Sequence, residues 1–186
     1  MKASLPLLLL MLLFLSPTTT SAQQIQPEKG YSPHIGVVVQ MLDDLKGRVT
    51  RSVVNLDQEG TDFLLDEGAN RIGAMILHLA ATEKYYQLYT FEGRGFNRAE
   101  QKEWGAAMDL GKRGREALQD KPISYYLDRW TEVRKETLRL LKTQDDDWFA
   151  AKVKGSSMNN HWAWYHVMEH QANHMGQIRL IIGRLP

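Results

Sequence analysis

None of the 186 residues of the chain is a cysteine. This absence excludes a disulfide framework, so the folded state has to be stabilised by a hydrophobic core, with a bound metal as a further source. It also removes thiolates from the candidate metal ligands and from the candidate nucleophiles. Any metal site in this chain must therefore be built without thiolate ligands.

The chain also lacks an excess of charge of either sign. Its 23 lysines and arginines and 22 aspartates and glutamates give a net charge of +1. Surfaces that bind nucleic acid or acidic lipid are usually rich in basic residues, so we expect neither partner. A phosphate-binding glycine loop is missing too, because Gly93-Arg94-Gly95 lacks the strand and the helix that flank such a loop.

Long apolar runs are missing except at the N-terminus. Lys2 is followed by an apolar run over residues 5–15 and by small residues that end at Ala22. This pattern is typical of a secretory signal, and the run is too short to span a membrane. We predict cleavage after Ala22, no membrane insertion afterwards, and export to the periplasm or the exterior.

Removal of residues 1–22 takes one lysine with it and leaves 22 basic residues against 22 acidic ones. We expect residues 23–31 to be a flexible lead-in, because they are polar and precede the first periodic segment. Residues 32–186 are long enough for one domain with a proper core.

Apolar residues recur at intervals of three and four in four segments, which predicts four long helices at about 33–55, 70–90, 122–143 and 157–182. Ser32 followed by Pro33 is a typical helix start. The fold class predicted is all-α, a four-helix bundle. We interpret residues 97–120 as a weakly helical connector, since three glycines interrupt the pattern, and expect a long crossover between the second and third main helices.

Four of the six histidines lie within fourteen residues near the C-terminus, and His166, His170 and His174 are spaced by four. This spacing places them along one face of a helix, where two neutral imidazoles one turn apart can bind a single metal ion. His78 lies in the apolar stripe of the second predicted helix. Bundles bind metals with side chains from facing helices, so His78 is a candidate third ligand.

Spacing alone leaves two ligand pairs open, His166 with His170 or His170 with His174. His166 and His174 are about 80° apart around the helix, so all three are not expected to bind one ion. The alternative without a metal is a polar stripe facing solvent, with His78 as an ordinary core histidine. His34 and His161 stand at helix starts, where a surface or capping role is expected.

The same spacing can be compared with the zinc-protease signature His-Glu-x-x-His. Here it reads HQANH, from His170 to His174. Gln171 stands where the signature has its glutamate, and an amide cannot act as general base. We therefore do not expect a zincin-type peptidase.

Three neutral histidines would leave a divalent ion with an open position for water, whose pKa the ion lowers. Imidazole suits several metals; we expect zinc or nickel first, with iron or manganese as alternatives. Asn173 and Gln177 lie near His174 and could orient the ligand rings through their second nitrogen. The partner expected at such a site is a small-molecule substrate.

Two segments of the sequence resemble the DinB/YfiT-like family of metalloenzymes. Residues 68–83 (GANRIGAMILHLAATE) are similar to the second helix of the family, and residues 166–178 (HVMEHQANHMGQI) to its last helix. The resemblance implies a four-helix bundle, often a homodimer, with a divalent metal held by His78, His170 and His174. His166 then becomes a neighbour of the site.

Some members of that family are S-transferases that use low-molecular-weight cytosolic thiols, and an exported protein would not meet those thiols. Two functional hypotheses follow. The first is a metal-dependent hydrolase or transferase acting on an unknown small molecule at the three-histidine site. The second is a non-catalytic metal- or ligand-binding protein of the cell envelope.

Overall fold

Helices dominate the computed structural model, which describes residues 24–186. In chain order they are α1 (Pro33–Val53), α2 (Gln58–Asp62), α3 (Ile72–Gln87), the π-helix η1 (Leu88–Glu92), α4 (Arg98–Asp109), α5 (Gly111–Ala117), α6 (Ile123–Leu141), α7 (Asp146–Ala150) and α8 (Asn160–Ile182). An isolated β-bridge joins Lys152 and Asn159, and residues 24–186 contain no strand. The predicted signal segment, 1–22, lies outside the described residues.

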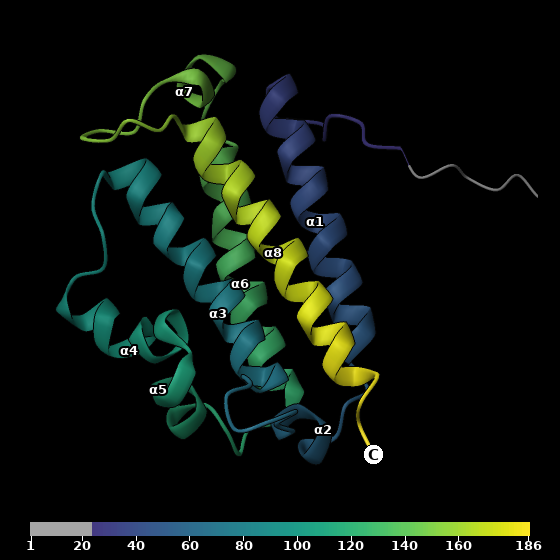
Figure 1. The fold of residues 1–186 in the computed structure, drawn as a ribbon. Helices are drawn as coiled ribbons and strands as arrows, with labels where there is room; N and C mark the ends of the chain where they lie inside the picture. The colour runs from purple at the N-terminus through teal and green to yellow at the C-terminus, as the bar shows by residue number, and fades with distance from the viewer. Residues whose placement is uncertain (1–23) are drawn as a thin grey trace, which may run out of the picture.

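The four long helices α1, α3, α6 and α8 pack side by side into a bundle (Figure 1). Each of the four predicted helical segments is found, so the all-α bundle is confirmed. The helices contribute to two adjoining apolar clusters, the larger formed mainly by α3, α6 and the end of α8, the smaller by α1, α7 and the start of α8. Trp130 and Trp164, both fully buried, lie in the larger and the smaller cluster respectively.

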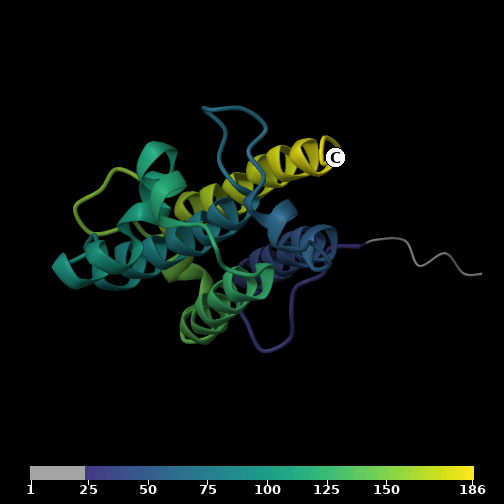
Figure 2. The same cartoon turned by 90° about the horizontal axis from the view of Figure 1, so that it is seen from below.

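The chain between α3 and α6 is the predicted crossover, and it is more helical than the sequence suggested. It begins with η1, which continues α3, and it contains α4 and α5, which lie outside the bundle on the side of α3 (Figure 2). Asn97 and Glu100 form a capping box that starts α4. The break between α4 and α5 lies at Leu110, whose φ of 53° interrupts the helix. Trp104 and Ala107 of α4 are buried in the larger cluster, so the crossover is part of the core.

The start of α1 is capped differently from the expectation. Ser32 occupies the N-cap position, but its side chain caps no backbone group; its hydroxyl donates to Asp146 of α7 over 2.6 Å. The Asp146 carboxylate accepts from the backbone N–H groups of His34 and Ile35 and pairs with the His34 ring. A side chain 114 residues from Ser32 thus supplies the cap, which local sequence cannot indicate.

Residues 24–31 contain no helix, and their backbone runs against α1, where the N atom of Glu28 lies 2.8 Å from the place a Cβ would take at Gly36. Tyr31 donates from its hydroxyl to the Leu138 carbonyl of α6 over 3.2 Å. Within residues 24–186, no helix combines the length and the hydropathy needed to cross a bilayer.

Two helical glycines give a matched test of the packing. A Cβ at Gly73 of α3 would lie 2.4 Å from the ring of the buried Tyr126 on α6, whereas a Cβ at Gly176 of α8 would meet nothing within 4 Å. We expect Gly73→Ala to lower the free energy of unfolding by about 1–3 kcal/mol through overpacking. Gly176→Ala should raise it by about 0.5–1 kcal/mol, because alanine favours the helix. Urea denaturation measures both, and equal effects of the two substitutions would contradict the close α3–α6 contact.

Candidate metal centre

Three histidines meet between α3 and α8. His78 comes from α3, and His170 and His174 come from successive turns of α8. Their ring centroids form a nearly equilateral triangle with sides of 4.8, 4.9 and 4.6 Å. One ring nitrogen from each residue lies within 4.8 Å of the other two. The fold therefore brings together the three residues predicted as ligands, while their binding of a metal stays a prediction.

A backbone carbonyl of the crossover orients the His78 ring. Nδ1 of His78 lies 2.8 Å from the carbonyl oxygen of Ala107, which can only accept, so Nδ1 carries the proton. Nε2 of His78 is then unprotonated and faces Nε2 of His170 at 2.8 Å. Metal-binding histidines usually donate the N–H that is not facing the metal to such a carbonyl or carboxylate, as Nδ1 of His78 does to Ala107. No residue type indicates this contact, because it is made by a main-chain atom 29 residues away.

All three rings are partly buried, and this lowers their pKa values. Burial is the largest cause for each, and it disfavours the imidazolium form. The positive charge that neighbouring histidines would carry adds to the effect and brings the pKa of His170 to about 3 and that of His174 to about 4. The rings are therefore neutral at physiological pH, which is the form that binds metals.

The donor set fits a divalent cation. Nδ1 of His174 is buried and has no hydrogen-bond partner among residues 24–186. Nitrogen ligands bound at about 2.0–2.1 Å to one tetrahedral ion lie about 3.3 Å apart. The separations in this cluster, from 2.8 Å to at most 4.8 Å, lie on both sides of that value. Three neutral nitrogens, without thiolate, suit a borderline metal such as zinc or nickel and leave coordination positions open.

His166 lies beside the cluster, one turn before His170. Its ring centroid is 5.7 Å from that of His170, and its other side stacks on Trp162 at 5.3 Å with an angle of 7° between the rings. Nδ1 of His166 lies 3.3 Å from the Glu169 carboxylate. Glu169, three residues after His166 on α8, thus contacts the His166 ring.

The two amides expected to orient the ligand rings lie at the exposed edge of α8. Asn173 donates to Glu169 over 2.9 Å. Gln177 lies close enough to offset slightly the lowering of the His174 pKa that burial and His78 cause. Nδ1 of His174 is nevertheless without a hydrogen bond among the described residues. The Ala107 carbonyl is the contact that does orient a ring of the cluster.

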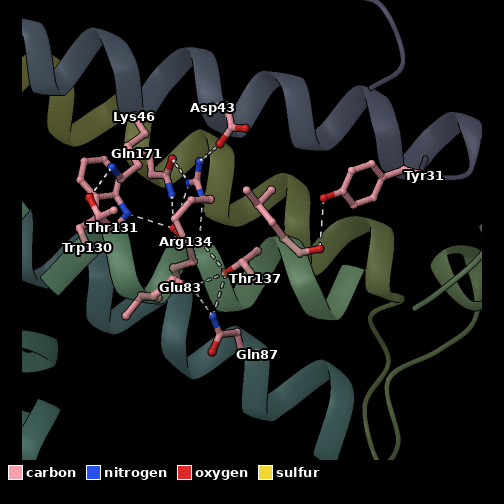
Figure 3. A network of polar contacts seen from close by, with 12 residues as sticks. Tyr31, Asp43, Lys46, Glu83, Gln87, Trp130, Thr131, Arg134, Thr137 and Gln171 are labelled. Carbon is pink, nitrogen blue, oxygen red and sulfur yellow. Dashed lines mark hydrogen bonds and ion pairs between the residues drawn. The ribbon is translucent and has the colours of Figure 1, made fainter. Parts of the chain in front are cut away.

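Gln171, next to His170, points into the bundle core (Figure 3). It is 1% exposed, donates to Glu83 of α3 over 3.2 Å and accepts from Arg134 of α6 over 3.3 Å. Its amide is therefore held by Glu83 and Arg134. The position that carries the general base in zinc proteases holds a structural side chain here.

Glu83 and Arg134 form a buried ion pair at the centre of this network (Figure 3). Nε and Nη2 of Arg134 donate to the two carboxylate oxygens over 2.7 and 3.0 Å, and Trp130 and Thr137 of α6 donate to the same carboxylate. Burial alone would raise the pKa of Glu83, but the charge of Arg134 and these hydrogen bonds hold it below its ordinary range. The pair stays charged and, together with Gln171, joins α3, α6 and α8.

The ligand assignment predicts which substitutions abolish metal binding. We expect the purified chain to bind about one divalent ion, and alanine at His78, His170 or His174 to weaken binding by more than the 10–100-fold typical of residues outside the coordination sphere. Elemental analysis and competition with a chromophoric chelator measure this. His161→Ala is the control, because His161 lies on the same helix but stacks on Phe149. Retention of full affinity in all three variants would disprove the site.

A protein-family model described as Mycothiol-S-transferase matches residues 37–184, a span from the second turn of α1 to just beyond the end of α8. The match includes all three clustered histidines and the crossover. No curated protein matches the chain.

Proposed function

We infer the function from the premise that the chain belongs to the mycothiol-S-transferase family, which is part of the DinB/YfiT-like superfamily. The resemblance seen in residues 68–83 and 166–178 is thereby confirmed. We propose that the chain is a metal-dependent transferase that joins the sulfur of a low-molecular-weight thiol to an electrophilic small molecule.

The observation that carries this proposal is the convergence of three neutral histidines on one point. His78, His170 and His174 would hold the ion. When bound, a divalent ion supplies a Lewis acid that lowers the pKa of a thiol, so that thiolate is available at neutral pH. The Ala107 carbonyl fixes the proton of His78 on Nδ1 and leaves Nε2 free for the ion.

We propose His166 as the residue that accepts the proton of the thiol. Its Nδ1 faces the Glu169 carboxylate, which favours a proton on Nδ1 and leaves Nε2 as the base. In the proposed reaction Nε2 takes the thiol proton, and the sulfur forms a bond to the electrophilic carbon. If that carbon carries a leaving group, the carbon–leaving-group bond breaks and the electron pair departs with the group. If it belongs to a double bond, the proton returns from His166 to the neighbouring carbon.

The family match favours the transferase over the hydrolase and the non-catalytic binding protein. The position that holds the general base of zinc proteases is also occupied by Gln171, an amide that is held by Glu83 and Arg134. Nothing in the match or in residues 24–186 supports a non-catalytic envelope protein. We propose zinc or nickel as the metal, because the three ligands that the cluster offers are all imidazole nitrogens.

Export remains a proposal that rests on residues 1–22. The family name points to mycothiol, a cytosolic thiol, whereas the N-terminal pattern points out of the cytoplasm. We propose that the chain is exported and uses whichever small thiol reaches it there. N-terminal sequencing of protein from its native host tests this: a start at Gln23 supports export, and a start at Met1 or Lys2 excludes cleavage.

The activity test uses the metal-loaded chain with chlorodinitrobenzene as electrophile and mycothiol, cysteine, glutathione or no thiol as second reactant. We expect thiol-dependent consumption that stops when the metal is removed. His166→Gln should keep the metal and lower kcat by about 100-fold or more, the usual contribution of a positioned base. His161→Gln, on the same helix, should change neither.

The other outcomes separate the alternatives. Metal-dependent consumption without any thiol would identify a hydrolase. A fully metal-loaded chain that consumes no electrophile with any thiol, and hydrolyses no ester or amide, would identify a non-catalytic metal-binding protein. A His166→Gln variant with unchanged kcat would remove His166 from the mechanism and leave the metal site standing.

A further inference from the structure

An open hollow lies at the start of α8, where the chain enters the helix from α7. It has a volume of about 580 Å³ and is lined by Ala150, Lys152, Ser157, Met158, Asn159 and Trp162. The hollow is large enough for a molecule of two fused rings, and it lies outside the metal cluster. Its lining combines an indole face and a thioether with one cationic group and two hydrogen-bonding side chains.

Trp162 connects this hollow to the histidines. Trp162 is 46% exposed, a high value for a tryptophan, although its indole stacks on His166. The same residue lines the hollow. His166 is in turn the ring next to His170. A ring bound on the open face of Trp162 would therefore be separated from the metal cluster by the Trp162–His166 stack along α8.

The charge at the hollow is positive. Lys152 is exposed and forms no ion pair with any residue in 24–186, and the other five lining residues are neutral. An unpaired ammonium group in the same hollow as an indole attracts a ligand that carries a negative charge at the edge of a flat ring. Ser157 and Asn159 also line the hollow and offer hydrogen bonds to such a ligand, Asn159 through its amide nitrogen because its oxygen caps α8.

We propose that this hollow is a binding site for a flat aromatic or conjugated organic acid, with its ring on Trp162 and its carboxylate at Lys152. The proposal deepens the proposed function, on which it rests for one point: the acid is the electrophilic co-substrate. Trp162 and His170 are eight residues apart, about 12 Å along the helix axis. The co-substrate is thus an elongated acid whose reactive carbon lies far from its carboxylate.

Two other occupants are conceivable and are decided by the test. A neutral apolar ligand would use Trp162 and Met158 but not Lys152. A second copy of the chain would cover Trp162 together with the neighbouring Tyr165, which is 47% exposed. The acid is favoured because it alone uses both the ring and the unpaired lysine.

The experiment is a calorimetric titration of the metal-loaded chain with 2-naphthoate, without thiol. We expect binding, at least about fivefold weaker binding of the cation 2-naphthylmethylamine, and weaker binding of the non-planar cyclohexanecarboxylate. Lys152→Gln should weaken naphthoate about fivefold and leave neutral 2-naphthol unchanged. Trp162→Leu should weaken both ligands about tenfold.

Matched controls are Lys154→Gln, an exposed lysine two residues away that does not line the hollow, and Tyr125→Leu, a 41% exposed aromatic residue on α6. Both should bind naphthoate as the unmodified chain does. All substituted side chains are exposed, so folding is retained, and circular dichroism and metal content are measured on each sample.

Absence of naphthoate binding, or equal loss in the test and control variants, would overturn the proposal. Binding of naphthol as tight as that of naphthoate would also overturn it. So would a dimer in size exclusion that Trp162→Leu dissociates, together with a hollow that binds no ligand in the titration. Because the titration needs neither thiol nor turnover, a failure here leaves the transferase proposal intact. Conversely, naphthoate binding to a chain without transferase activity would keep the site and remove its assigned role.

Discussion

The ion pair between Glu83 and Arg134 is the constraint on which the rest of the bundle depends. Glu83 is fully buried, and a buried charge that loses its partner typically costs about 3–5 kcal/mol. Its partners lie on α6 and α8, and Arg134 also reaches Asp43 of α1 over 2.9 Å. The four long helices must therefore keep one relative register to satisfy it. Gln171 belongs to this network, and His170 is the residue directly before it in the chain. The same register therefore directs His170 toward His78.

The parts of the fold that could be predicted from the sequence are those set by local periodicity. The four long helices and the grouping of histidines on α8 depend on the spacing of residues within one segment. That spacing can be read directly from the sequence. His78 was a candidate third ligand from its place on a facing helix, and the resemblance then selected His170 and His174 as the other two. The Glu83–Arg134 pair joins residues 51 positions apart, and the Ala107 contact is made by a carbonyl that every residue possesses. Neither leaves a pattern in the residue types, which is why both were missed.

The histidine cluster and the family match are consistent with the same chemistry. The cluster offers a cation three uncharged nitrogens in a partly buried setting, and the family acts on thiols, whose reactivity depends on losing a proton. Gln171 shows how a familiar spacing can mislead: the residue that would be catalytic in a protease is part of the core here. The proton acceptor that we propose is His166, one turn before His170, with the Glu169 carboxylate at its Nδ1.

The hydrogen bond from His78 to Ala107 gives the crossover a role beyond covering α3. A bundle with the crossover deleted or replaced would retain the three imidazoles, but the His78 ring could rotate and exchange its two tautomers. Metal capture would then carry the entropic cost of selecting one arrangement from several. Families that share this bundle could therefore tune metal affinity by changing a loop, with every ligand left in place. A search for the determinants of affinity that compares only histidines would overlook them.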